Sequence, residues 1–383
     1  MRESISVNKF LRSLACLNPD NAGNGCISYC VKRGASWRRV LDEAESEGVN
    51  GLLFHHMRRM NLLDALPPPI CRKLEDSYKA VVRRNLDHMA CLISIEQIIK
   101  ADGIRAIVLQ GLSLLKIYGD PGLRPMSDMD LLVKPEQAEI MISSLKQIGF
   151  KVQFPDKPDL LIKDDVLLDI HTHPLNIDRI RSRKNIFPED ITRFWERASP
   201  FSNAGESLLC MDMFDSFLCL SAHALKHCYS RLIWLCDLKE LLHRILEDKN
   251  GWNVLIKRSE SCGQKRILVY SLLMLEQVYE IVVPPKVKRT LNCSRTSIIE
   301  KRILSLMADG TKFETAYVIL WLFSINGYLN KVRFLKETFL PRRAIMASMV
   351  KKKPVNIVIS DYCGRLLYLS RKIGRELSVI LKG

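Results

Sequence analysis

Residues 108–113, VLQGLS, and residues 124–133, RPMSDMDLLV, decide the expected fold of this chain. The first stretch ends a short β-branched run at Gly111, and the chain is then helical in pattern to Tyr118. The second stretch begins with two acids around a methionine and closes on Leu-Leu-Val, as a strand that enters a hydrophobic core does. A strand, a glycine turn, a helix and a second strand predict a small α/β unit.

The residues that follow extend this unit to a sheet. Pro135 begins an expected helix that ends near Gly149, and two strand-like runs follow at residues 160–163 and 166–171. Asp164 and Asp165 join the two runs and predict a hairpin. We therefore expect an α/β (α+β) protein whose small mixed-sheet catalytic core occupies residues 103–174.

The segments on either side of this core are expected to be helical. From about Cys71 to Lys100, apolar residues recur at every third or fourth position, which is typical of an amphipathic helix. After Pro174 the pattern is helical throughout, most strongly at residues 207–227 and 234–246. We expect an N-terminal helical segment at residues 1–102 and a C-terminal helical domain at residues 175–383.

Composition narrows the class of protein. The 383 residues are 47% hydrophobic, which excludes a disordered chain and allows more than one domain. A net charge of +16 favours an anionic partner such as a nucleotide, a nucleic acid or a membrane surface. The 12 cysteines are scattered singly without zinc spacing, and the charges near the N-terminus interrupt any export signal. The longest apolar run, residues 316–325, is about half of a membrane span. We expect a soluble, cytoplasmic protein with no membrane partner.

A candidate metal site lies at the acids of the second stretch. Asp128 and Asp130 are two positions apart on the expected strand, so both carboxylates should project from one face. Acids side by side repel each other unless a cation bridges them, and Mg²⁺ accepts carboxylate, water and phosphate oxygens. Asp169 is the candidate third acid, because an unused carboxylate is costly inside an apolar strand. Asp164 and Asp165 compete for this role by position, but a turn leaves them solvated more simply.

Candidate phosphate and substrate contacts surround these acids. Gly111 lies at a strand-to-helix turn, where backbone N–H groups favour a phosphate. Ser113 offers a hydroxyl and Arg124 a forked donor. His171 shares the face of Asp169 and is either a substrate contact or a structural histidine. The pair His223 and His227, four apart on an expected helix, ligates a metal, lines an interdomain cleft or packs in a core.

This order of glycine turn, helix, Asp-x-Asp strand and later single Asp resembles the DNA polymerase beta-like nucleotidyltransferase superfamily. More narrowly, residues 110–133 resemble the bacterial family of uncharacterised nucleotidyltransferases, as do the Asp-x-His run at residues 169–171 and the spaced histidines near the helical end. Two residues depart from the pattern. Leu112 stands where the superfamily usually has Gly or Ser, and Gln110 stands where the narrower family usually has Lys.

The resemblance implies transfer of a nucleoside monophosphate from an NTP, with ATP as the first candidate, to an unidentified acceptor hydroxyl, with release of pyrophosphate. It implies that Asp128, Asp130 and Asp169 hold two Mg²⁺ ions, with Asp169 alternatively acting as base. The implied phosphate contacts are Gln110, Gly111, Ser113 and Arg124. The basic charge favours an anionic acceptor, nucleic acid included. The alternative is a non-catalytic RNA- or protein-binding protein on the same fold.

Overall fold

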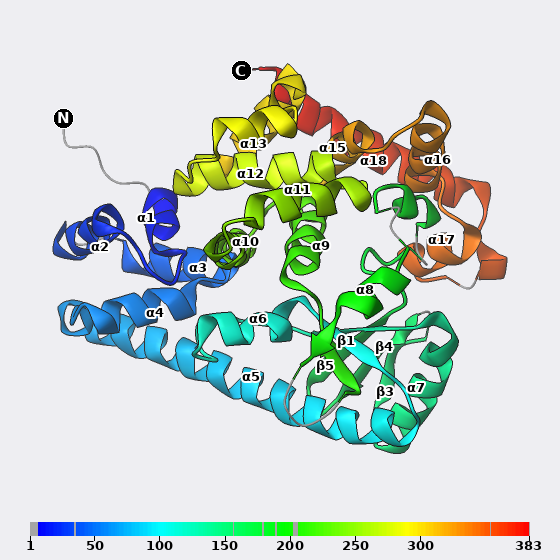
Figure 1. Cartoon of the computed structure of the whole chain (residues 1–383), viewed down its shortest axis with the longest axis horizontal. Helices are drawn as coiled ribbons and strands as arrows, with labels where there is room; N and C mark the ends of the chain where they lie inside the picture. The colour runs from blue at the N-terminus through cyan, green and yellow to red at the C-terminus, as the bar shows by residue number, and fades with distance from the viewer. Residues whose placement is uncertain are drawn as a thin grey trace.

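A seven-stranded mixed sheet lies at the lower right of the molecule in Figure 1, with helices before, beside and after it in the chain. The computed structural model describes residues 7–33, 36–155, 157–177, 180–187, 190–201, 206–352 and 354–382. The strands are β1 (Ala106–Leu109), β2 (Met129–Val133), β3 (Lys151–Phe154), β4 (Lys157–Lys163), β5 (Val166–His171), β6 (Ser199–Pro200) and β7 (Leu208–Cys210). The expected α/β class is confirmed.

The strand order is β3-β4-β5-β2-β1-β7-β6. In the middle, β2 runs parallel to β5 and antiparallel to β1, while β1 runs parallel to β7. Successive residues of a strand point to opposite faces, so each strand feeds two cores. Ile107 and Leu132 belong to the core on one face, and Val108 and Leu131 to the core on the other.

Helices cover both faces of the sheet. The second face packs against α5 (Pro68–Ala101) and α7 (Pro135–Gln147). The first face shares a continuous core with the N-terminal helices and with most of the helices after the sheet. Figure 1 shows α5 along the lower edge of the molecule, from the N-terminal helices to the sheet. The amphipathic helix expected from Cys71 to Lys100 is therefore confirmed.

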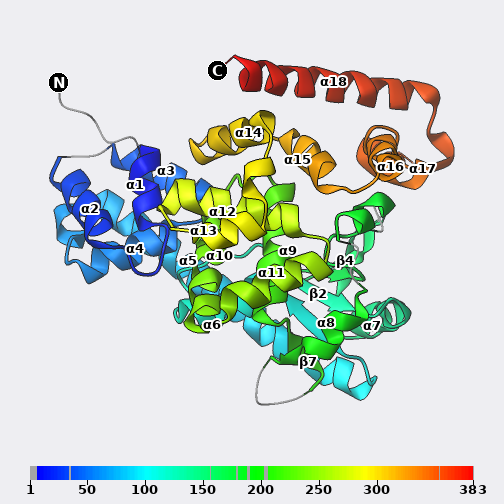
Figure 2. The same ribbon diagram turned by 45° about the horizontal axis from the view of Figure 1, so that its top comes forward.

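The remaining helices lie before, within and after the sheet. Before α5 come α1 (Val7–Leu14), α2 (Asn21–Arg33), α3 (Trp37–Glu47) and α4 (Asn50–Arg59). Within the sheet region are α6 (Gln110–Tyr118) and α8 (Thr192–Arg197). After it come α9 (Met213–Lys226), α10 (Leu232–Glu247), α11 (Gly251–Ser261), α12 (Lys265–Tyr279), α13 (Pro285–Thr290), α14 (Ile298–Ala308), α15 (Ala316–Ser324), α16 (Tyr328–Phe339), α17 (Arg343–Val350) and α18 (Ile359–Leu381). Figure 2 shows α18 lying across the outer side of α14 to α17.

The periodicity predicted that the chain after Pro174 is helical throughout. This prediction is wrong in one region, because β6 and β7 add two strands to the sheet. β7 has three residues, too few to show a period, and it is held by its pairing with β1. The helix expected from residue 207 consequently starts at Met213. The Asp212 side chain caps it by accepting hydrogen bonds from the backbone N–H groups of Phe214 and Asp215.

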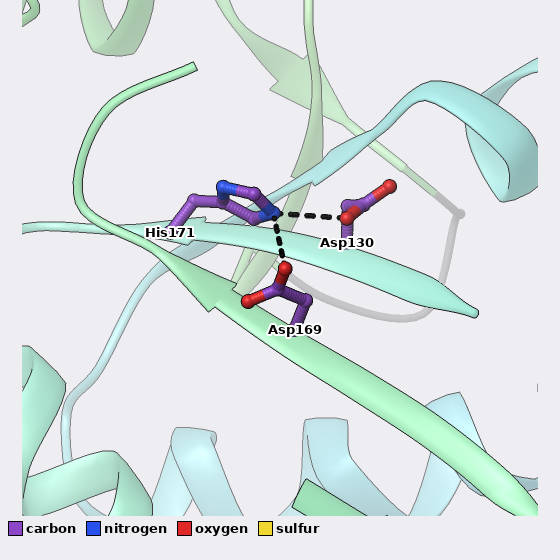
Figure 3. Close-up of side chains that lie close together, drawn as sticks. All are labelled: Asp130, Asp169 and His171. Atoms are coloured by element: carbon purple, nitrogen blue, oxygen red, sulfur yellow. Dashed lines mark hydrogen bonds and ion pairs between the residues drawn. The ribbon is translucent and has the colours of Figure 1, made fainter. Parts of the chain in front are cut away.

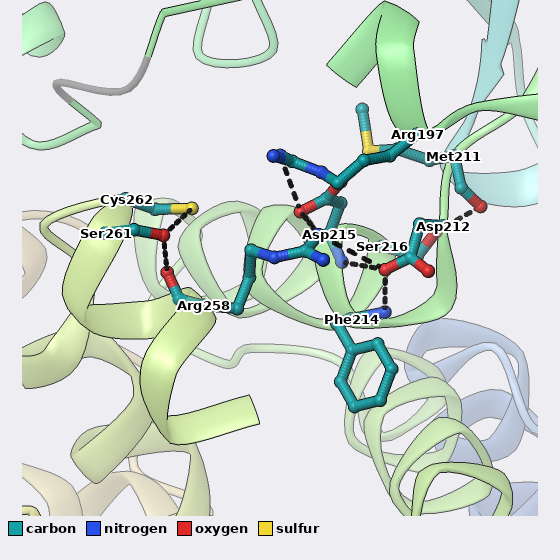
Figure 4. Close-up of polar contacts among 9 residues, drawn as sticks. All are labelled: Arg197, Met211, Asp212, Phe214, Asp215, Ser216, Arg258, Ser261 and Cys262. Atoms are coloured by element: carbon teal, nitrogen blue, oxygen red, sulfur yellow. Dashed lines mark hydrogen bonds and ion pairs between the residues drawn. The ribbon is translucent and has the colours of Figure 1, made fainter. Parts of the chain in front are cut away.

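A buried ion-pair network fixes the helix that follows β7 (Figure 4). Asp215 of α9 is fully buried and accepts hydrogen bonds from Arg197 Nε at 2.7 Å and from Arg258 Nη1 at 2.5 Å. These arginines come from α8 and α11, so one carboxylate joins three helices. Because a buried charge is stable only when it is paired, the network holds α9 against α8 and α11.

All twelve cysteines are free. Among the helices that the structure describes, none combines the length and the apolar character that crossing a membrane requires.

Candidate active site

Parallel pairing of β2 with β5 brings two of the predicted acids together. Asp130 lies opposite Asp169 in the register of the two strands, and His171 follows two residues later on the same face. The imidazole Nε2 of His171 lies 2.9 Å from Asp130 Oδ1 and 3.4 Å from Asp169 Oδ2 (Figure 3). These three side chains lie on the face of the sheet that α9 and α10 cover. Leu132, two residues beyond Asp130 on the same face of β2, belongs to the core that contains these helices.

Asp130, Asp169 and His171 form the group of three metal-ligating side chains found in the described part of the chain, with one ligand atom of each within 4.8 Å of the others. The two facing carboxylates call for a cation, and their oxygens suit Mg²⁺. In the structure the imidazole lies between them. Burial opposes a charge on His171 more than any single contact favours it, but the hydrogen bond to Asp130 and the negative charges of Asp130 and Asp169 together raise the pKa of His171. Burial also raises the pKa of Asp169 to about 6.

Asp128 lies beside this group rather than within it. It precedes β2 by one residue, and its carboxylate accepts a hydrogen bond of 2.9 Å from the Ser127 hydroxyl. Burial, followed by repulsion from Asp130, raises the pKa of Asp128. The structure thus places all three predicted acids around one cleft, with Asp130 and Asp169 in contact with a common partner and Asp128 at the margin.

The glycine turn forms one end of the cleft. Gln110 begins α6 with a positive φ of 45°, which tightens the passage from β1 into the helix. A Cβ on Gly111 would lie 2.6 Å from Met126 Sδ and 3.0 Å from Arg124 Nη1, so any larger residue here would force the Met126 or Arg124 side chain to shift. Gln110 and Gly111 line the cleft. Ser113 lines a small neighbouring cavity instead, and its hydroxyl donates to the Gln110 carbonyl at 2.6 Å.

Arg124 lines the same end of the cleft and is held from two sides. Its Nε and Nη2 atoms donate to the carboxylate of Asp237, at 3.0 and 2.8 Å, and Tyr118 donates to the same carboxylate at 2.7 Å. The side chain of Asn85, on α5, donates to the backbone carbonyls of Pro121 and Arg124. The helical region after the sheet thereby supplies the counter-ion of a predicted phosphate contact. An acid within the strongly apolar helix at residues 234–246 was the sequence signal for this role.

The helices α9 and α10 form the opposite wall of the cleft, which has a volume of about 310 Å³. Six of its lining residues come from these helices and the turn between them: His223, Lys226, His227, Arg231, Ile233 and Trp234. The sheet wall is acidic and this wall is basic and aromatic. A cation can therefore be held on one side and the phosphates of a ligand on the other. The predicted cleft residues His171, His223 and His227 all lie in this lining.

Comparison with known proteins identifies the family of this chain. The model of a family described as uncharacterised nucleotidyltransferase matches residues 33–280, well over half of the chain. The matched range holds the whole sheet, the three acids and both helices of the opposite wall. Neither a curated protein nor a solved structure matches the chain significantly.

Proposed function

Since this chain belongs to the uncharacterised nucleotidyltransferase family, we propose that it transfers a nucleoside monophosphate from an NTP, with ATP as the first candidate, to an acceptor hydroxyl and releases pyrophosphate. The observation that carries the proposal is the pairing of Asp130 with Asp169 in register, at a cleft whose other wall holds Lys226 and Arg231. Acids for metal ions and cations for phosphates then face each other across one cleft.

The acids fit a divalent metal site. We assign Asp128, Asp130 and Asp169 to two Mg²⁺ ions. Bound Mg²⁺ would supply charge neutralisation on the triphosphate and on the leaving pyrophosphate. His171 donates its Nε2–H to Asp130, which orients that carboxylate in the way that outer partners orient metal ligands.

The phosphates bind at the glycine end in this proposal. Gly111 lies in the first turn of α6 and lines the cleft without a side chain, so the backbone N–H groups at this end of the helix can meet an anion. Arg124 keeps its Nε–Nη2 edge on Asp237, while its Nη1 lies beside Gly111. A guanidinium held in this way loses little conformational freedom when a phosphate binds.

Two roles are assigned to Asp169, and they differ in their consequences. As a metal ligand, it is needed for Mg²⁺-dependent NTP binding. As a general base, it needs a pKa near the working pH, and its value of about 6 meets that condition. An Asp169→Asn variant that binds Mg²⁺·NTP but does not turn over identifies the base, and one that loses binding identifies the ligand.

The first experiment is calorimetric titration of each of the four NTPs with Mg²⁺ into the wild type and into Asp130→Asn. Asp165→Asn is the matched control, because Asp165 lies in the hairpin turn with a φ of 64°, which asparagine tolerates. Binding that needs Mg²⁺, survives in the control and is lost in Asp130→Asn supports the proposal. Absence of binding to a folded wild type overturns it and favours the alternative, an RNA- or protein-binding role.

We further propose an anionic acceptor, with nucleic acid as one class, because the net charge is +16 and the wall opposite the acids is basic. Filter binding of RNA and DNA at rising salt tests this. If both RNA and DNA bind weakly even at low salt, a nucleic-acid acceptor is excluded and the search turns to neutral acceptors. The free cysteines agree with a reducing cytosol, where we place the protein.

A further inference from the structure

Three aromatic rings gather on the wall of the cleft that faces the acids. We call His223, His227 and Trp234 the aromatic wall. The two imidazole centroids are 4.8 Å apart, and the indole centroid lies 5.3 Å from that of His223 and 5.1 Å from that of His227. All three side chains line the cleft. The chemistry proposed above gives them no role.

The aromatic wall is firmly placed. The helix α9 that carries His223 is anchored by the buried Asp215 network. Trp234 lies in the first turn of α10. It is partly buried and packs against the large hydrophobic core. The guanidinium of Arg231 lies 5.9 Å from the indole centroid, and its Nε donates to the Ser46 carbonyl. Little ordering is therefore needed when a ligand contacts these rings.

The rings are also uncharged at neutral pH. Burial, helped by the positive charge of Lys226, lowers the pKa of both His223 and His227. Neutral rings contribute flat surfaces and hydrogen-bonding edges rather than positive charge. The positive charge on this wall belongs to Lys226 and Arg231, on either side of His227 in the sequence.

We propose that the aromatic wall binds the base of the NTP by stacking. This inference rests on the proposed function, in which the acids and the glycine turn take the triphosphate. A nucleobase is the planar aromatic part of such a substrate, and stacking on aromatic side chains suits any base. Because overlap area sets the stacking strength, purine NTPs should bind more tightly than pyrimidine NTPs.

Intrinsic fluorescence and calorimetry together test the inference, with Mg²⁺·ATP and Mg²⁺·tripolyphosphate as probes. Tripolyphosphate has the phosphates of ATP but no base. We expect ATP, and not tripolyphosphate, to quench a signal that Trp234→Phe removes. Trp252→Phe, in α11 outside the cleft lining, is the matched control and should keep the quenching. In Trp234→Leu, ATP affinity should fall roughly 10- to 100-fold while tripolyphosphate affinity stays unchanged.

His227→Ala, at the residue that follows α9, provides a second variant, and it should also weaken the binding of ATP but not of tripolyphosphate. Equal losses for the two probes, or no loss of ATP affinity in either variant, would overturn the stacking inference. A wild type that binds both probes equally well would do the same, while the proposed function stands. A wild type that binds neither probe overturns the proposed function together with this inference.

Discussion

Asp237→Asn should lower the stability of this protein strongly, although it keeps the volume of the side chain and removes only its charge. Asp237 is 1% exposed and Arg124 5% exposed, and they share hydrogen bonds of 2.8 and 3.0 Å. Asparagine has nearly the same volume but no charge, so the buried guanidinium loses its counter-ion. Removing one partner of a buried pair costs about 3–5 kcal/mol of unfolding free energy. That is a large part of the stability of an ordinary folded chain.

Urea unfolding followed by circular dichroism measures this cost. The matched control is Asp42→Asn, which removes an ion pair of similar length, 3.0 Å to Lys73, whose side chains are 59% and 52% exposed. Surface pairs contribute about 1 kcal/mol or less, so the control should differ little from the wild type. The same two variants are then titrated with Mg²⁺·ATP, and only Asp237→Asn should bind more weakly, because Arg124 is no longer held beside Gly111.

A double-mutant cycle decides whether the pair itself is responsible. Arg124→Met removes the other charge, and the double variant should be more stable than Asp237→Asn alone, since no unpaired charge stays buried. If Asp237→Asn costs no more than Asp42→Asn, or if the double variant is the least stable of all, the reasoning from burial and pairing is refuted.

Three further predictions concern the acid group, the turn and the last helix. The raised pKa of Asp169, about 6, means that the folded state binds its proton more tightly than the unfolded state, so ionisation of this group lowers stability as pH rises from about 4 to 6. Asp169→Asn should then be more stable than the wild type by about 1–3 kcal/mol at pH 7 and equal to it near pH 4, and urea curves showing no such convergence would contradict this. Gly111→Ala places a Cβ 2.6 Å from Met126 Sδ, so it should cost about 1–3 kcal/mol and weaken Mg²⁺·NTP binding; unchanged calorimetry would speak against a tight turn. Glu376 accepts hydrogen bonds from the backbone N–H groups of Glu314 and Thr315 and from the Thr315 hydroxyl, so Glu376→Ala should speed hydrogen exchange in α18 but not in the sheet, and equal protection of α18 in both proteins would refute the anchor.

Local signals carried much of the fold. The recurrence of apolar residues at every third or fourth position predicted the bounds of α5 to within a few residues. It did so because one apolar face of the helix packs against a core over most of its length. The hairpin at Asp164 and Asp165 was predicted without glycine, and both residues have a positive φ, which short polar side chains tolerate. The period of two placed Asp169 and His171 on one face of their strand before any neighbour was known.

Other features depend on distant parts of the chain. β7 is a strand only because β1 pairs with it, and three residues carry too little pattern to predict that. Asp237 meets Arg124 across more than a hundred residues of sequence, so no local spacing could assign the pair. The position of His171 between Asp130 and Asp169, where the imidazole lies close to both carboxylates, likewise follows from the pairing of two strands.

By itself, the sequence predicted which residues carry chemistry, and it determined which face of its own strand or helix each one occupies, because the period of a strand or helix repeats along the chain. Only the tertiary structure decided that β2 and β5 are parallel neighbours in a register that sets Asp130 against Asp169, and that α9 and α10 close the cleft above them. Strand register is selected by burial of whole faces against distant helices, a sum of long-range contacts that no local pattern contains.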